Sequence, residues 1–269
     1  MTVEGERAVG ESKDLVFEVC GSIGVITFNR PQARNALTLA MYDGLAEICH
    51  AAPEDPAIKA LVIKGAGGQA FAAGTDISSF RNVLTTDDAL AYERRIDGVL
   101  SAIECCPLPV IAALAGACTG GGAGIAAASD LRIAAADLKF GFPIARTLGN
   151  CLSNASLSRF LALIGSGRTQ EMLFTARLIG AEEALAIGLV SEIVESFQVV
   201  EARGMELARI VAGHAPLTLR ATKEALRRLR VHQLEAGDED LISLCYTSED
   251  FREGQLAFLE KRPPRWKGS

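Results

Sequence analysis

Apolar and polar positions along the first half of the chain follow two periodicities, the alternation of a β-strand and the spacing of an α-helix. Residues 14–31 alternate around Gly21, which predicts a β-hairpin that stops at Pro31. Residues 39–49 then carry apolar side chains at helical spacing, with Thr38 as a plausible N-cap. Segments typical of a buried strand or of a helix follow one another at residues 58–65, 88–106, 108–116 and 130–136. This alternation of strands and helices predicts an α/β architecture in layers.

The pattern becomes almost wholly helical after Ser153. Residues 180–194 predict a short helix that ends at Gly188 and leads into an extended segment. Amphipathic helical stretches follow at residues 216–229 and 238–262. Because no Ser/Gly-rich linker separates the two parts, we expect a continuous body at residues 1–200 and a helical C-terminal region at residues 201–269.

Composition narrows the class of protein. The chain has 269 residues, 49% of them hydrophobic, so it can bury a sizeable core. A net charge of −6 disfavours a nucleic-acid partner. The basic run from Arg220 to Arg230 fits a solvated helix face, because leucines lie beside it at helical spacing. The 7 cysteines include no Cys-x-x-Cys pair, so they predict neither a disulfide framework nor a zinc site and suit the reducing cytoplasm.

Two segments bear on targeting. The N-terminal residues 1–14 are charged and lack the apolar run of a signal peptide. Residues 105–129 are long and uncharged enough to span a bilayer, but Pro107, Pro109 and a glycine cluster interrupt them. A strand, a turn and a buried helix explain this segment better than one membrane helix. We therefore expect a cytoplasmic protein without a membrane partner.

Three glycine-containing stretches are candidates for a close backbone approach. "GAGGQA", residues 65–70, fits the dinucleotide pattern G-x-G-x-x-A, but the helix and acidic residue that the pattern requires do not follow. "FAAGTD" and "TGGG" each place small residues directly after an apolar strand. There the N–H of Ala73 and that of Gly121, at a helix N-terminus, could meet at one oxygen as an oxyanion hole. Two tight turns packed against neighbours would give the same pattern, so spacing alone leaves both interpretations open.

Four ordered blocks carry a family resemblance that covers nearly the whole chain. They are "AFAAGTDI", "PVIAALAGACTGGGAGIAAASDLRIAAADLKFGFP", "LFTARLIGAEEALAIGLVSEIV" and "TSEDFREGQLAFLEKRPPRWKG". In this order and spacing they closely resemble the enoyl-CoA hydratase/isomerase (crotonase) family. The resemblance implies an α/β, crotonase-like spiral of ββα units, with residues 201–269 as a helical trimerisation region. It also implies an acyl-CoA thioester as ligand, a homotrimer or dimer of trimers, and no metal or cofactor apart from the coenzyme A of the substrate.

The resemblance also implies site residues. By position, Ala73 and Gly121 look like the two backbone donors that hold the thioester carbonyl. The remaining substrate-binding positions implied by the resemblance are Gly74, Thr75, Asp76 and Gly120. Ala73 to Asp76 look like the segment that lines the adenine and pantetheine path.

Two departures from the family pattern change the expected chemistry. The residue two after the third glycine is a glutamate in the family's hydratases, and here it is Gly124. A second glutamate follows the proline of their "FG-x-P" motif, where this chain has Ile144. The two glutamates are the acid and base of hydration. A positioned acid or base contributes roughly 10²- to 10⁴-fold in rate, so ordinary hydration is expected to be slow or absent.

Substitute groups lie in the divergent stretch after Ile144. Ser153 aligns roughly where dehalogenases and diene isomerases of the family carry an aspartate, but it also suits a helix N-cap. Arg146 is a candidate partner for a carboxylate on the acyl group, or else forms a surface or interface salt bridge. Cys151 is either a nucleophile or, as is usual for cysteine, a buried apolar thiol.

The sequence therefore predicts an acyl-CoA thioester-binding enzyme that stabilises an enolate-like oxyanion with backbone N–H groups and uses non-standard acid and base residues. The alternative is a non-catalytic acyl-CoA carrier or sensor that kept the binding residues and lost the proton-transfer groups.

Overall fold

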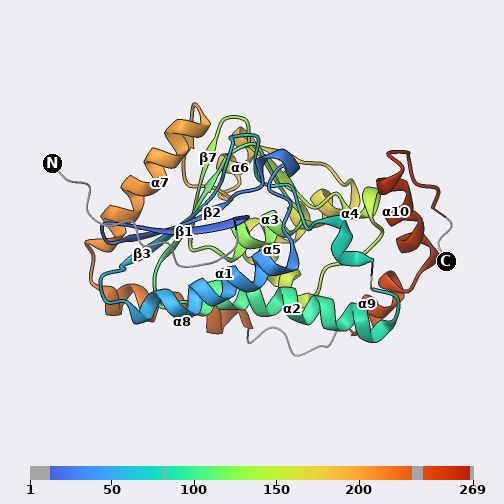
Figure 1. Cartoon of the computed structure of the whole chain (residues 1–269), viewed down its shortest axis with the longest axis horizontal. Coiled ribbons are helices and arrows are strands. Elements are labelled where there is room, and N and C mark those ends of the chain that lie inside the picture. The colour runs from blue at the N-terminus through green and yellow to red at the C-terminus, as the bar shows by residue number, and fades with distance from the viewer. Residues whose placement is uncertain (1–12, 82, 232–238, 267–269) are drawn as a thin grey trace.

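Two β-sheets form the centre of the computed structural model, which describes residues 13–81, 83–231 and 239–266 (Figure 1). The larger sheet has the strand order β1-β2-β3-β5-β7-β10, formed by Leu15–Cys20, Ile23–Phe28, Ala60–Gly65, Val110–Leu114, Leu131–Ala135 and Ile193–Val194. β1 and β2 pair antiparallel across a turn in which Gly21 has a φ of 65°, so the predicted hairpin is confirmed. The other neighbours in this sheet are parallel, as expected for strands that are apolar throughout.

The smaller sheet has the order β4-β6-β8-β9, formed by Ala70–Ala72, Ala117–Thr119, Lys139–Gly141 and Ile179–Gly180. Three times in succession, the chain runs through a strand of the larger sheet, a strand of the smaller sheet and then a helix. The helices that close these units are α2 (Thr86–Cys105), α3 (Gly121–Ala128) and α4 (Ile144–Thr147). This repetition confirms the expected spiral of ββα units.

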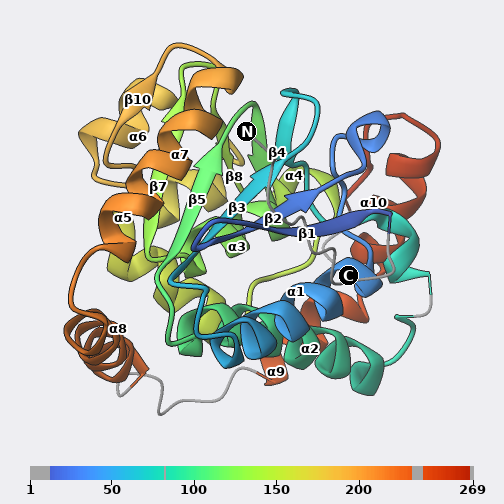
Figure 2. The same ribbon diagram turned by 60° about the vertical axis from the view of Figure 1, so that its left-hand side comes forward.

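Helices cover both faces of the larger sheet (Figure 2). α7 (Phe197–Ala212) packs on one face through β3, β5 and β7, where small and β-branched side chains such as Val62 and Ala113 meet Val200 and Ala208. The other face packs against α1 (Leu39–Ala51), α2 and α3 in the main core. The remaining α-helices are α5 (Asn154–Phe174), α6 (Ala181–Ala186), α8 (Pro216–Val231), α9 (Glu239–Tyr246) and α10 (Glu249–Leu259).

Local capping accounts for several helix ends. Thr38 is the N-cap of α1 as predicted, because its Oγ1 accepts a hydrogen bond from Met41 N (3.2 Å). α2 begins before the predicted residue 88, because Thr85 and Asp88 form a capping box there. The single helical stretch predicted at 238–262 is wrong. Ser248 interrupts it and accepts a hydrogen bond from Phe251 N (2.9 Å), which starts α10 separately from α9.

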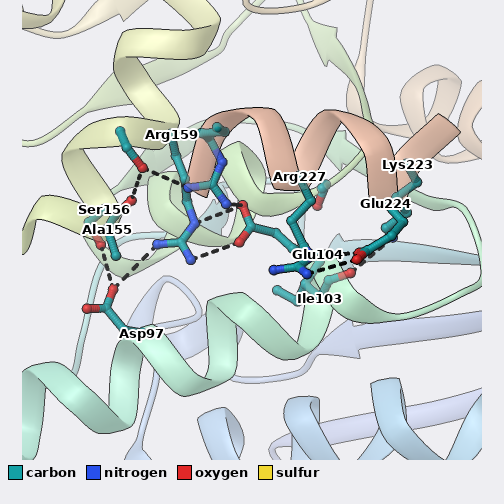
Figure 3. Close-up of polar contacts among 12 residues, drawn as sticks. Asp97, Ile103, Glu104, Ala155, Ser156, Arg159, Lys223, Glu224 and Arg227 are labelled. Atoms are coloured by element: carbon teal, nitrogen blue, oxygen red, sulfur yellow. Dashed lines mark hydrogen bonds and ion pairs between the residues drawn. The ribbon is translucent and has the colours of Figure 1, made fainter. Parts of the chain in front are cut away.

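Partly buried polar contacts attach α8 to α2 and α5 (Figure 3). The Glu104 carboxylate on α2 accepts from Arg230 on α8 (2.6 Å) and from Arg159 on α5 (2.9 Å). Lys223 donates to the carbonyl oxygen of Ile103 (3.0 Å), and this backbone contact fixes the middle of α8. The basic run is therefore only in part the solvated face that the sequence predicted.

The apolar stripe of α8 faces outward in this chain. Of the leucines that gave the segment its helical spacing, Leu226 (63%) and Leu229 (69%) are exposed and Leu219 is half-buried. Leu217 (76%), in the first turn of α8, is exposed as well. The periodicity identified the helix correctly, and it is the charged side chains of α8 that form hydrogen bonds to the rest of the described chain.

Candidate active site

Two glycine-containing loops lie side by side where β4 and β6 end. Gly74 and Gly120 have φ angles of 114° and 54°, a region of backbone conformation that favours glycine. A Cβ on Gly120 would lie 3.3 Å from Gly74 Cα, and one on Gly74 would lie 3.6 Å from Thr119 O. The two stretches singled out in the sequence, "FAAGTD" and "TGGG", are thus brought together by the fold.

A cavity of about 180 Å³ opens beside these loops. Its wall includes Thr75, Gly121, Gly124 and Ile144, together with side chains from α2 and α9. An apolar cavity of about 150 Å³ is large enough to bind benzene, so this volume fits a short acyl group. Most of the wall is apolar or aromatic, as is usual for a small-molecule site.

The backbone donor predicted at Ala73 is already used inside the protein. Ala73 N–H donates to the carbonyl oxygen of Arg34 (3.0 Å), so it does not stand free as the sequence interpretation required. The N–H of Thr75, two residues further on, is not used in this way. Leu37 N donates to Gly74 O and Asp76 N donates to Leu37 O, both at 2.8 Å. The N–H of Thr75, which lies between these two contacts, therefore faces away from Leu37.

Thr75 and Gly121 together offer two backbone donors at the cavity. No described residue accepts a hydrogen bond from Thr75 N. Gly121 is the first residue of α3, where an N–H has no intrahelical partner. A Cβ on Gly121 would lie 3.2 Å from Thr75 Oγ1, so these two residues are neighbours. The signal that the sequence interpretation missed is Gly74, whose φ of 114° turns the chain between residues 73 and 75.

Asp76 supports the loop from outside the cavity wall. Its carboxylate accepts from Arg30 Nη1 (2.9 Å) and from Ser78 N (3.1 Å). Partial burial opposes ionisation, but the hydrogen bonds from Ser78 and the charge of Arg30 outweigh it and lower the pKa of Asp76 below its ordinary value. This carboxylate is therefore charged at neutral pH and already partnered.

The wall is apolar at the two positions where family hydratases carry glutamate. A Cβ on Gly124 would meet Leu100 Cδ1 at 3.3 Å and Phe142 Cζ at 3.9 Å, and Ile144 also lines the cavity. The single carboxylate among the described lining residues is Glu93, which accepts a hydrogen bond from the Tyr246 hydroxyl. The sequence contained a signal for Glu93, because it shares the apolar face of α2 with Ile96.

Ser153 is the N-cap of α5 and lies outside the cavity wall. Its hydroxyl accepts from Ser156 N (3.1 Å) and donates to Asp97 Oδ1 (2.9 Å). These contacts match the structural alternative that the sequence left open for Ser153. Arg146 is exposed and is likewise not a lining residue.

Cys151 packs near the end of the cavity, beside Cys245 of α9. A hydrogen bond between the two thiols lowers the pKa of Cys245 to about 7, although partial burial acts against it. Neither sulfur belongs to the cavity wall.

Comparison with known proteins identifies the family to which this fold and site belong. The model of the enoyl-CoA hydratase/isomerase family matches residues 18–269. The chain belongs to the enoyl-CoA hydratase/isomerase family. A short-chain-enoyl-CoA hydratase from Clostridium acetobutylicum is 31% identical over 255 residues, which is 94% of this chain and 97% of the relative. A 2,3-dehydroadipyl-CoA hydratase from Escherichia coli is 33% identical over 91% of this chain and 94% of its own length.

Solved structures of the family show the same fold. A methylmalonyl-CoA decarboxylase in complex with 2-nitronate-propionyl-CoA superposes with a TM-score of 0.85, at 29% identity over 95% of this chain and 98% of that one. An enoyl-CoA hydratase/carnithine racemase from Magnetospirillum magneticum gives a TM-score of 0.77 at 32% identity over 96% of this chain and 97% of that one.

Among the described residues, no group of three or more His, Cys, Asp or Glu side chains is arranged to hold a metal ion. None of the helices traced there combines the length and apolar character needed to cross a membrane.

Proposed function

We propose that this family member binds an acyl-CoA thioester in the cavity and stabilises an enolate of that thioester with the N–H groups of Thr75 and Gly121. The pair of unpartnered N–H groups beside the cavity is the observation that carries this proposal. A backbone oxyanion donor contributes on the order of 3 kcal/mol to a transition state. Gly121 also begins α3, so the helix dipole favours negative charge there.

The same cavity argues against ordinary hydration. Adding water across an enoyl double bond needs a positioned acid and base, and Gly124 and Ile144 supply neither. An enolate formed by breaking a carbon–carbon bond does not need a base, because the electrons of that bond remain on the α carbon. A methylmalonyl-CoA decarboxylase with the same fold supports such chemistry here.

A non-catalytic acyl-CoA carrier or sensor is the second candidate. The specific observation in its favour is that Glu93, the one carboxylate on the described cavity wall, already accepts a hydrogen bond from Tyr246. A carrier needs the binding cavity but no group that moves a proton.

Calorimetry and a decarboxylation assay distinguish these candidates. Micromolar binding of butyryl-CoA, with release of carbon dioxide from a malonyl-type thioester, is the expected result for an enzyme that stabilises an enolate formed by carbon–carbon cleavage. Binding without turnover of crotonyl-CoA or of malonyl-type thioesters would support the carrier. Hydration of crotonyl-CoA at ordinary hydratase rates would overturn the proposed loss of hydration, and absence of any thioester binding would overturn both candidates.

We also propose that the chain assembles as a homotrimer or a dimer of trimers, with α8 in the contact. The exposed leucines Leu217, Leu226 and Leu229 support this proposal, since a second subunit would remove them from water. Light scattering on the purified chain tests it, and a monomer at micromolar concentration would contradict it.

A further inference from the structure

Three hydroxyl groups form a chain at the cavity wall, next to the proposed oxyanion site. Tyr42 comes from α1, Thr75 from the loop after β4, and Tyr92 from α2. The Tyr42 hydroxyl lies 2.9 Å from Thr75 Oγ1, and the Tyr92 hydroxyl lies 3.1 Å from the same atom. Both distances are those of hydrogen bonds, with Thr75 in the middle.

The three hydroxyl groups have one more O–H donor than they use in hydrogen bonds to one another. Each hydroxyl has one hydrogen to donate, so three hydroxyls bring three hydrogens to two hydrogen bonds. Within the described part of the protein, these hydroxyls have no hydrogen-bond partner except one another. One O–H is therefore not used within the hydroxyl chain and can donate to an acceptor in the cavity. An oxygen of a bound ligand is such an acceptor.

The position of Tyr42 indicates which oxygen that is. A Cβ on Gly121 would overlap the Tyr42 hydroxyl oxygen, so this hydroxyl lies directly against the first residue of α3. Tyr42 and Gly121 both line the cavity, so the hydroxyl and the N–H belong to the same part of its wall. Tyr42 is fully buried, and its ring belongs to the main core, so its place is fixed by packing.

We infer that the Tyr42 hydroxyl is a third donor to the thioester oxygen, oriented by a hydrogen-bond chain that runs from Tyr92 through Thr75 to Tyr42. This inference rests on the proposed function, since it requires a thioester oxygen at Gly121. Tyr42 then contacts the substrate, whereas Thr75 Oγ1 and Tyr92 act as positioning groups. A chain of hydroxyls in which each donates to the next strengthens its last member, because each bond polarises the following one.

The surroundings keep these tyrosines protonated. Burial raises the pKa of Tyr42 and of Tyr92 above the ordinary tyrosine value. The nearby charge of Glu93 raises both further, although the hydrogen bond with Thr75 acts in the opposite direction. Tyr42 is consequently a hydrogen-bond donor across the neutral range and not a base. It strengthens the stabilisation of an enolate without replacing the missing carboxylates.

Acetoacetyl-CoA is a suitable probe, because its acidic α carbon ionises to an enolate that absorbs in the near ultraviolet. Titration of the bound probe against pH gives the pKa of the enolate in the site, and each donor to its oxygen lowers that pKa. Tyr42→Phe removes the hydroxyl and keeps the ring. We expect it to raise the pKa of bound acetoacetyl-CoA by about one unit, a tenfold loss of enolate stabilisation, while butyryl-CoA affinity changes less than about threefold.

Two further changes test the hydroxyl chain itself. Thr75→Val removes the side-chain oxygen but keeps the backbone N–H, and should also raise the pKa of the bound enolate, whereas Thr75→Ser should restore it. Tyr92→Phe keeps the hydrogen bond between Thr75 and Tyr42, and should have a smaller effect than Tyr42→Phe. If Tyr42→Phe fails to fold, the comparison of Thr75→Val with Thr75→Ser remains as the test.

The outcomes separate the inference from the proposed function. A wild-type protein that binds neither acetoacetyl-CoA nor butyryl-CoA overturns both. A wild-type protein that binds the probe as an enolate, with an unchanged enolate pKa in Tyr42→Phe and in Thr75→Val, overturns the third donor alone. Equal weakening of butyryl-CoA and of the enolate in Tyr42→Phe also overturns it, because that result marks a general packing defect.

Discussion

Substituting Gly121 by alanine tests the close approach of α3 to the Tyr42 hydroxyl. The added Cβ would overlap that oxygen and lie 3.0 Å from Tyr42 Cζ. Tyr42 is fully buried and hydrogen-bonded to Thr75, so its ring cannot swing into solvent to make room. The substitution therefore forces a shift of either the ring or the start of the helix.

The size of the effect follows from three contributions. Overpacking a filled core costs about 1–3 kcal/mol, and loss of the Tyr42–Thr75 hydrogen bond costs about 1 kcal/mol more. Alanine in place of glycine in a helix returns up to about 1 kcal/mol. We expect Gly121→Ala to lower the free energy of unfolding by about 2 kcal/mol, which for a chain of this size lowers Tm by about 4–8 °C.

Gly124→Ala is the matched control, one turn further along α3. Its Cβ would meet only the ends of the Leu100 and Phe142 side chains, at 3.3 Å and beyond, so its Tm should stay level or rise. Scanning calorimetry of both variants, and of Gly121→Ala combined with Tyr42→Phe, measures the effect. Equal stability of the two alanine variants, or no recovery in the combined variant, would refute the reasoning.

Three further predictions follow from the site and its support. Gly124→Glu combined with Ile144→Glu places two carboxylates on the cavity wall, and crotonyl-CoA hydration, measured by loss of enoyl absorbance, should rise at least tenfold. Cys245 should react with iodoacetamide with a midpoint near pH 7, because its thiolate forms above that pH, and Cys151→Ala should move the midpoint upward; an unchanged midpoint would contradict the thiol–thiol hydrogen bond. Glu104→Gln removes the carboxylate that buried Arg159 and half-buried Arg230 share, and leaves Arg159 only its longer contact with Asp97, so urea denaturation should show a loss of about 3 kcal/mol, and a loss below about 1 kcal/mol would contradict that account.

Sequence patterns were reliable where a local rule decides the outcome. The hairpin around Gly21, the N-cap at Thr38 and the apolar parallel strands each depend on neighbours in the chain, and each was predicted correctly. The four ordered blocks were enough to give the family, and the approach of "FAAGTD" to "TGGG" followed from it. The absence of carboxylates at Gly124 and Ile144 could likewise be predicted by position alone.

The sequence by itself determined most of the elements, the family and the small-residue loops, because these depend on spacing along the chain. Only the tertiary structure decided which backbone N–H is left over. The N–H of Ala73 donates to the carbonyl of Arg34, and that of Thr75, after the turn at Gly74, has no backbone acceptor among the described residues. Tyr42 and Tyr92 show the same limit of prediction from sequence, since helical spacing indicates only that both are core residues. That their hydroxyls meet at one threonine beside an unpartnered N–H depends on how three separate segments pack, and no local pattern records it.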